Sequence, residues 1–404
     1  MQKILVSVTL LNMFSPSGFN VNYTFYTVSF ALLLVGCNQP TDRGQQYIDG
    51  GFNNVLNPVT FIASDKPHDY LRFLAQLEKV EIQSPLLSRS NQPLYNGVKI
   101  WLSESGEPTA LTDYGIKLEQ MGGSDGEGNV LFTGYFSPVI EMRHQADTVF
   151  RYPMYAFPTC VERCPTREEV YNGALDGLGL ELGYSASLID NFIMEIQGSG
   201  FIHFDNRDQL EYFAYGGKNG HPYVSIGKVL IERGLVSREK MSLKAIKDWV
   251  SMQDETSVIE LLNQNPSYIF FLPKQSAPVT GTAGIPLLPY TSVAADKNFL
   301  PMGTILMAEV PQLNEEGDWN GKHVLKLLLA LDTGSAVKEN HLDLYHGIGK
   351  AAGIKAGYHK HFGRVWKLTK PIVDVKSDEA ITHDKQNITF KNVVNSASTL
   401  TLPM

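Results

Sequence analysis

The sequence predicts an α+β protein that is mainly β, with short strands gathered in the C-terminal half and helices before and between them. Apolar residues recur at helical spacing in residues 68–80. After residue 268, runs rich in β-branched and apolar residues alternate with Gly, Pro and Asn turns. Several closely spaced short strands of this kind are typical of a barrel.

Five segments read as helices and seven as strands. The helices are expected over 68–80, 94–102, 226–234, 242–250 and 256–265. Ser242 and Thr256 are the expected N-caps, and Pro266 ends the last helix. The strands are expected over 130–140, 150–157, 268–272, 291–296, 303–310, 323–331 and 364–370. Residues 323–331 are almost continuously apolar, which predicts a strand that is buried on both faces.

Length and composition set the class of the protein. A chain of 404 residues that is 43% hydrophobic and 19% charged suggests two to three globular domains with a sizeable core. The net charge is −8 and no basic run occurs, which argues against a nucleic-acid partner. An uncharged sugar polymer remains compatible, because it is held by hydrogen bonds and stacking.

The N-terminus predicts export and a lipid anchor. Residues 21–36 are apolar and end in small residues, as in the core of a signal peptide. The sequence LVGC (34–37) resembles a bacterial lipobox, in which the thiol of Cys37 is lipidated. Asn38 is not the Asp that retains lipoproteins at the inner membrane, so we expect an outer-membrane protein facing the periplasm. Lys3 supplies the only positive charge in this leader, which is an irregularity.

The cysteines and histidines indicate neither a metal nor a cofactor. Cys160 and Cys164 do not have zinc-pair spacing, so two isolated thiols are the favoured interpretation and a local disulfide the alternative in an oxidising compartment. Four C-terminal histidines invite a metal hypothesis, but their spacing matches no familiar site. They are His341, His346, His359 and His361.

The strongest candidate for chemistry is Asp332, in LLLALDTGSAV (327–337). An apolar strand runs directly into this carboxyl group, and burial there raises the pKa of a carboxylic acid. A carboxyl that keeps its proton near neutral pH can protonate a glycosidic oxygen. Turn stabilisation is the plainer alternative. Asp296 and Asp343 lie at comparable strand or turn boundaries.

The Asp-Thr-Gly-Ser run also resembles an aspartic protease. That mechanism needs two carboxylates which share a proton. A single chain would therefore carry a second Asp-Thr/Ser-Gly after another apolar strand. The only near match is Ser124-Asp125-Gly126, which has the wrong order and no such strand before it.

Together, these segments resemble the membrane-bound lytic murein transglycosylase A family. The blocks that carry the resemblance are FTGYFSPVIEMRH (132–144), DNFIMEIQGSGFIHF (190–204), YGGKNGHPYVSIGKVLI (215–231), NPSYIFF (265–271), SVAADKNFLPMGT (292–304) and ALDTGSAVKENHLDLYHGIG (330–349). The last two blocks are similar to the family's three-aspartate module, with its acids at Asp296, Asp332 and Asp343. Glu339 departs from the family's usual glycine, which puts the groove shape in doubt.

The resemblance implies a fold and a division into domains. A double-psi β-barrel domain would comprise residues 37–138 together with 268–376. A smaller β-rich domain would be inserted at 139–267, and the glycan would lie in the groove between the two. Residues 1–36 would be the signal peptide and 377–404 a loose tail.

The resemblance also implies a lyase, a peptidoglycan lytic exotransglycosylase, although the residues themselves do not distinguish endo from exo cleavage. Asp332 would serve as acid and then base, cutting the β-1,4 bond between N-acetylmuramic acid and N-acetylglucosamine and leaving a 1,6-anhydro ring. Asp296 and Asp343 would be supporting acids. The expected substrate contacts are Thr133, Tyr135, Gln197, Ser199, Asn219 and His221.

The expected partners are peptidoglycan strands, the outer membrane through the anchor, and proteins of cell-wall synthesis or division. Two alternatives stay open at this point. One is a muramidase with two carboxylates, Asp332 and Asp343. The other is a peptidoglycan-binding lipoprotein without catalytic activity.

Overall fold

A computed structural model describes residues 66–160, 163–205, 209–275, 277–314 and 319–370. It also gives the backbone of two short paired strands, β1 (Tyr47–Ile48) and β2 (Gly51–Phe52). The predicted signal peptide, Cys37 and the tail after 376 lie outside the described residues. No helix in the described ranges combines the length and apolar character needed to cross a bilayer.

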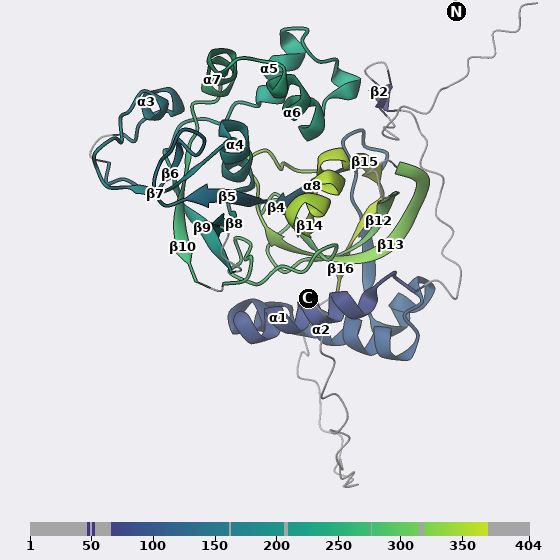
Figure 1. Cartoon of the computed structure of the whole chain (residues 1–404). Coiled ribbons are helices and arrows are strands. Elements are labelled where there is room, and N and C mark those ends of the chain that lie inside the picture. The colour runs from purple at the N-terminus through teal and green to yellow at the C-terminus, as the bar shows by residue number, and fades with distance from the viewer. Residues whose placement is uncertain are drawn as a thin grey trace, which may run out of the picture. The chain divides into compact units, whose positions relative to one another are not determined.

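The larger sheet has eight strands and mixes parallel with antiparallel pairing (Figure 1). Their order across the sheet is β15 (Lys360–Gly363), β4 (Val130–Ser137), β14 (His341–Ile348), β11 (Ser292–Ala294), β13 (Trp319–Asp332), β12 (Ile305–Leu313), β16 (Val365–Thr369) and β3 (Lys117–Gln120). The pairs β4–β14 and β11–β13 are parallel. This order places residues near 133 beside residues near 343.

Strand β13 is buried on both faces where it approaches Asp332, which confirms the expectation from its apolar run. Leu327, Leu329 and Leu331 belong to one core cluster, whereas Leu328 and Ala330 belong to a second. The first cluster includes residues of α1 (Tyr70–Gln83) and α2 (Pro85–Glu104), which lie side by side and precede the 3₁₀ helix η1 (Pro108–Tyr114). The end of β13 is therefore held rigidly from two sides.

A second sheet of six strands forms between β4 and β11 in sequence. Its order is β10 (Ile269–Lys274), β9 (Leu210–Lys218), β8 (Gly200–Phe204), β5 (Val139–Arg143), β7 (Glu181–Ser185) and β6 (Tyr152–Tyr155). The helices of this region are α3 (Arg167–Tyr171), α4 (Leu188–Gln197), α5 (Ile226–Glu232), η2 (Arg238–Lys240), α6 (Leu243–Ser251) and α7 (Glu255–Asn263). The sheet has its own core, which includes Met142, Met194 and Phe213.

A buried ion pair ties α3 to α4 beneath this sheet. The guanidinium of Arg167 contacts the carboxylate of Glu195 at 2.7 Å, and both side chains are at most 2% exposed. Arg167 also donates to the carbonyl oxygens of Asn265 and Ser267, just before β10. Its charge lies over the ring of Phe192 at 4.6 Å. One cation thus holds three segments together.

Helix α8 (Gly349–Tyr358) follows β14 and packs on β4 (Figure 1). The contact is so close that a Cβ atom at Gly134 would lie 2.7 Å from both the Cα of Ala356 and the Nε2 of His346. Only glycine fits there. Strand β4 therefore has no side chain at the single point, Gly134, where α8 comes closest, while Phe136 on the same face packs against α8.

Most predicted elements are present, with differences at their ends. Ser242 caps α6 as expected, by accepting from the backbone N–H of Ala245. The cap predicted at Thr256 is wrong, because the carboxylate of Asp254 accepts from the N–H of Ser257 instead. The helix expected over 94–102 is the second half of the longer α2, which contains Pro93. The fold is mixed α and β with two sheets.

Candidate active site

Asp332 ends β13 and accepts four hydrogen bonds. Its Oδ1 accepts from the backbone N–H of Thr282 at 2.8 Å, from the Thr282 hydroxyl at 2.7 Å and from the N–H of Thr333 at 2.8 Å. Its Oδ2 accepts from the hydroxyl of Tyr135 at 3.1 Å. Burial raises the pKa of Asp332, and all four of these donors oppose that rise. Such a set of donors stabilises the ionised carboxylate.

Asp343 lies on β14, opposite Thr133 of the parallel strand β4. The Thr133 hydroxyl donates to its Oδ1 at 2.7 Å. Burial raises the pKa of Asp343 to about 7, against that hydrogen bond and with help from the negative charge of Asp332. Asp343 therefore retains its proton near neutral pH to a much greater extent than an ordinary aspartic acid does.

Tyr135 donates to Asp332 and is influenced by the charges of both acids. Burial, followed by the charges of Asp332 and Asp343, raises its pKa well above the ordinary value, so its hydroxyl stays protonated and donates. Its ring packs against Tyr345 with the centroids 5.2 Å apart. Sequence reasoning predicted sugar contacts for Thr133 and Tyr135, and the structure has both hydroxyls bonded to the acids.

Asp296, the third acid, accepts hydrogen bonds from two loop backbones. Hydrogen bonds from the backbone N–H groups of Asn298 at 3.1 Å and Glu339 at 3.4 Å lower its pKa. Glu339 has a positive φ of 47°, a conformation that glycine adopts more easily. Asp296 thus holds the loop between β13 and β14 in place as an ionised group.

Gln197 and Ser199 lie where α4 turns into β8. The Oε1 of Gln197 accepts from the backbone N–H of Phe136 at 2.9 Å, which ties α4 to β4. Gln197 also lines a cavity of about 210 Å³, together with Thr133, Ser242 and Lys360 among other residues of β4, α6 and α8. The predicted contacts Thr133 and Gln197 are therefore brought to one cavity.

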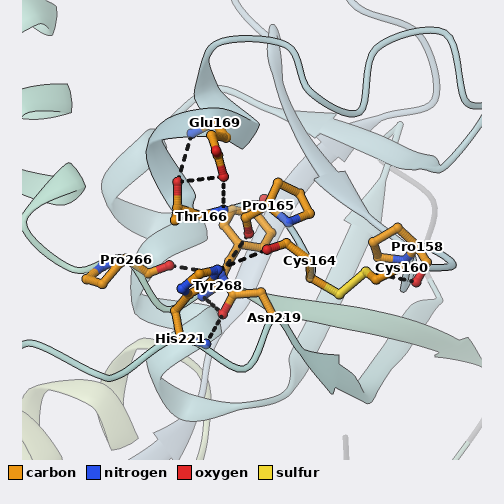
Figure 2. The surroundings of a disulfide bond; sticks show 10 residues. All are labelled: Pro158, Cys160, Cys164, Pro165, Thr166, Glu169, Asn219, His221, Pro266 and Tyr268. Carbon is orange, nitrogen blue, oxygen red and sulfur yellow. Dashed lines mark hydrogen bonds between the residues drawn. A yellow bond between two sulfur atoms is a disulfide. The ribbon is translucent and has the colours of Figure 1, made fainter. Parts of the chain in front are cut away.

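Asn219 and His221 lie elsewhere, in the loop that Figure 2 shows. The Nδ2 of Asn219 donates to the carbonyls of Pro165 at 2.9 Å and Pro266 at 2.8 Å, and its Oδ1 accepts from the N–H of Tyr268 at 2.9 Å. The ring of His221 contacts the carbonyl of Cys164 at 2.9 Å. The Asn219 amide is thus occupied in joining chain segments, and its predicted role in substrate binding stays a prediction.

The segment between β6 and α3, whose Cys164 carbonyl His221 contacts, contains a disulfide between Cys160 and Cys164 (Figure 2). The favoured interpretation of two isolated thiols is therefore wrong, and the alternative holds. Sequence spacing could not decide this, because four residues of separation allow but do not require the two thiols to meet.

Three of the C-terminal histidines gather behind β4. The Nε2 of His346 contacts the Nδ1 of His359 at 2.9 Å, and the ring centroid of His361 lies 5.9 Å from that of His359. Burial lowers the pKa of His346 to about 3 and that of His359 well below its usual value. Over the described ranges, no three His, Cys, Asp or Glu side chains are arranged to hold a metal ion.

Sequence reasoning missed Thr282 as a site residue. The available signal was the run Thr-Gly-Thr-Ala-Gly (280–284). A Cβ atom at Gly281 would lie 2.5 Å from the Leu331 carbonyl oxygen, so glycine is what allows this segment to reach Asp332. His341 was considered only as a metal ligand, but its Nε2 lies 2.7 Å from the Thr133 hydroxyl.

A mixed sheet that brings together two carboxyls with raised pKa values, that of Asp343 at about 7, defines a site suited to general acid–base catalysis. Matches to two protein-family models identify the family of enzymes to which this site belongs. Residues 131–272 match the model described as "MltA specific insert domain", and residues 291–369 match the "3D domain".

Relatives with the same family name are similar in sequence to this chain over nearly their whole length. The chain is 59% identical to the membrane-bound lytic murein transglycosylase A of Vibrio cholerae serotype O1, over 88% of this chain and 96% of that one. It is 46% identical to the protein of the same name from Escherichia coli K12, over 86% and 95%. A crystal structure of E. coli MltA with bound chitohexaose superimposes with a TM-score of 0.74 at 45% identity, covering 82% of this chain and 99% of that one. The chain belongs to the membrane-bound lytic murein transglycosylase A family.

Proposed function

We propose that this enzyme cleaves the β-1,4 bond between N-acetylmuramic acid and N-acetylglucosamine in peptidoglycan without water, and that Asp343 provides the proton. The activity rests on family membership. The choice of Asp343 rests on one observation: its pKa is raised to about 7, whereas four hydrogen-bond donors oppose the rise that burial causes in the pKa of Asp332. This changes the role that the sequence assigned to Asp332.

In the proposed reaction, protonated Asp343 gives its proton to the bridging oxygen as the bond from that oxygen to C1 breaks. The positive charge that develops at C1 is stabilised by the negative charge of Asp332. The C6 hydroxyl of the same sugar then attacks C1, and its proton passes to Asp343. The products are a 1,6-anhydro ring and a regenerated acid, so no second nucleophile is needed.

The hydrogen bonds that the two aspartates accept suit Asp343 to the role of acid and Asp332 to that of a negative charge. For Asp332 to act as an acid it would have to carry a proton against four groups that donate to it. Asp343 accepts a single hydrogen bond, from Thr133. The charge of Asp332 raises the pKa of Asp343, so the ionised residue helps its neighbour to stay protonated.

The test compares Asp343→Asn with Asp332→Asn on purified sacculi, with the products read by mass spectrometry. We expect anhydro ends from the wild type and no release from Asp343→Asn. Asp332→Asn removes the charge that raises the pKa of Asp343, so its remaining activity should decline at a lower pH than that of the wild type. Activity retained by Asp343→Asn would refute the assignment, and reducing ends instead of anhydro ends would indicate a hydrolase.

We further propose that Thr133, Tyr135, Gln197, Ser199 and His221 contact the glycan, and that Asn219 contributes to its binding through the loop that carries His221. The cavity lined by Thr133, Gln197 and Ser242 supports contacts near Gln197. The amide of Asn219 is already occupied, so its contribution would be to hold the loop that carries His221.

The domain division is proposed as expected, with 139–267 inserted into a double-psi β-barrel domain of 37–138 and 268–376. The parallel pairs β4–β14 and β11–β13 within the eight-stranded sheet support such a barrel. We also propose that Cys37 is lipidated, that the protein faces the periplasm from the outer membrane, and that it contacts proteins of cell-wall synthesis or division. The Cys160–Cys164 disulfide supports an oxidising compartment.

A further inference from the structure

His341 and Asp343 both contact the Thr133 hydroxyl. The two residues alternate with buried Leu342 on β14, so their side chains share one face of that strand. The Thr133 Oγ1 lies 2.7 Å from the Nε2 of His341 and 2.7 Å from the Oδ1 of Asp343. Thr133 comes from the neighbouring strand β4, directly opposite Asp343. The hydroxyl therefore bridges an imidazole and the proposed acid.

A hydroxyl has one proton and so donates to only one of these neighbours. If Thr133 donates to Asp343, its oxygen accepts from His341, and the Nε2 of His341 must carry a hydrogen. If Thr133 donates to His341 instead, that Nε2 must be bare. Asp343 must then be protonated on Oδ1 and donate to Thr133. The tautomer of His341 and the position of the acid's proton are thus linked.

The two arrangements differ in whether the proton can reach the substrate. Within the described ranges, Oδ1 is the only oxygen of Asp343 with a hydrogen bond to the protein. In the first arrangement the acid's proton therefore lies on Oδ2, which has no partner among the described residues and is free to pass its proton to a substrate. In the second arrangement the proton lies on Oδ1, between Asp343 and Thr133, and is unavailable for transfer.

We infer that His341 is a positioning residue whose Nε2–H directs the Thr133 hydroxyl to Asp343 Oδ1 and so keeps the acid's proton on Oδ2, the oxygen that is not bonded to Thr133. This inference rests on the proposed role of Asp343. Burial lowers the pKa of His341, which favours a neutral ring with a single N–H. A ring N–H donated to the Ala336 carbonyl opposes that shift. A charged ring can donate there and through Nε2 at once, whereas a neutral ring serves the inference only if its single N–H lies on Nε2.

The tautomer is measured by ¹⁵N NMR of the imidazole in the whole protein. We expect the Nε2 of His341 to show the shift of a protonated ring nitrogen. In Thr133→Val, which keeps the shape of Thr133 but lacks its hydroxyl, that signal should move. A bare Nε2 in the wild type would overturn the inference.

Kinetics test the consequence on soluble, un-cross-linked peptidoglycan strands. His341→Leu should lower kcat about tenfold, the worth of one hydrogen bond, with KM nearly unchanged. His341→Gln places an amide N–H where Nε2 lies and should restore most of that loss, whereas the shorter His341→Asn should not. His144→Leu is the matched control, because His144 is half exposed and pairs with Asp205.

A double-mutant cycle shows whether His341 acts through Thr133. On the Thr133→Val background, His341→Leu should cause no further loss. A full additional loss, or a His341→Leu enzyme as active as the wild type, would overturn the inference. Binding of chitohexaose and the unfolding temperature identify variants that have failed to fold. If Asp343→Asn is active, the proposed acid is wrong; if only the histidine results fail, the acid stands and this inference falls.

Discussion

Replacing Glu195 by Gln should destabilise the protein strongly, because it leaves the charge of Arg167 buried without a counter-ion. Both side chains are at most 2% exposed. Burial raises the pKa of Glu195 and the adjacent Arg167 opposes that rise. We take the pair as ionised, because a guanidinium keeps its proton and donates to both carboxylate oxygens.

The size of the effect follows from what remains around the arginine. After the substitution, Arg167 still meets the carbonyls of Asn265 and Ser267 and the ring of Phe192. These groups are neutral, so they satisfy hydrogen bonds but not the charge. Breaking a buried pair in this way costs about 3–5 kcal/mol. At 2–4 °C for each kcal/mol, the unfolding temperature should fall by roughly 10 °C.

The assay is thermal unfolding followed by circular dichroism. Removing both charges with Arg167→Met and Glu195→Leu should cost less than Glu195→Gln alone, since no unpaired charge is left. Asp248→Asn, which breaks an exposed pair with Lys244, is the control and should leave the unfolding temperature unchanged. An unchanged unfolding temperature in Glu195→Gln, or a double variant that loses the sum of both single losses, would refute the reasoning.

Three further predictions concern stability. Replacing Cys160 and Cys164 by Ser should cost roughly 2 kcal/mol in chemical denaturation, as expected for so short a loop, and a thiol reductant should have the same effect on the wild type but none on the variant. Because burial lowers the pKa of His346 to about 3 and that of His359 well below its usual value, both are neutral when folded, and stability is lost as pH falls below the unfolded value of about 6.5. Between pH 6.5 and 5, the free energy of unfolding should fall by about 2 kcal/mol per histidine. His346→Gln should halve that fall, and a free energy of unfolding that does not change with pH would contradict the prediction. Glu339→Gly should raise the free energy of unfolding by up to 1 kcal/mol or so, because φ is 47° there, and a loss would show that the side chain contributes more than the strain costs.

The sequence predicted those features that depend on local pattern. The apolar run before Asp332 correctly indicated a strand buried on both faces, because continuous apolar residues leave no face for solvent. The cap at Ser242 was likewise readable from its neighbours. The cap of α7 was misjudged by two residues, since Asp254 and Thr256 are both good caps and only the fold selects one.

The division of roles between the acids was not readable in the same way. The pKa of a carboxyl depends on its donors, and those of Asp332 come from Thr282, Thr333 and Tyr135, on three separate parts of the chain. No local pattern counts donors that arrive from residues 50 and 197 positions away. The disulfide and the contact between His341 and Thr133 likewise depend on tertiary structure.

The two faces of strand β14 limit how the sequence of this enzyme can vary. His341 and Asp343 occupy one face of the strand, while Leu342 and Leu344 on the other face are packed in the core. Shifting the strand by a single position would exchange these faces and bury the reactive groups. The proposed acid is thus fixed to a strand whose other face is packed in the core, and we expect variation in which glycan is accepted to come from the loops and the inserted strands around it.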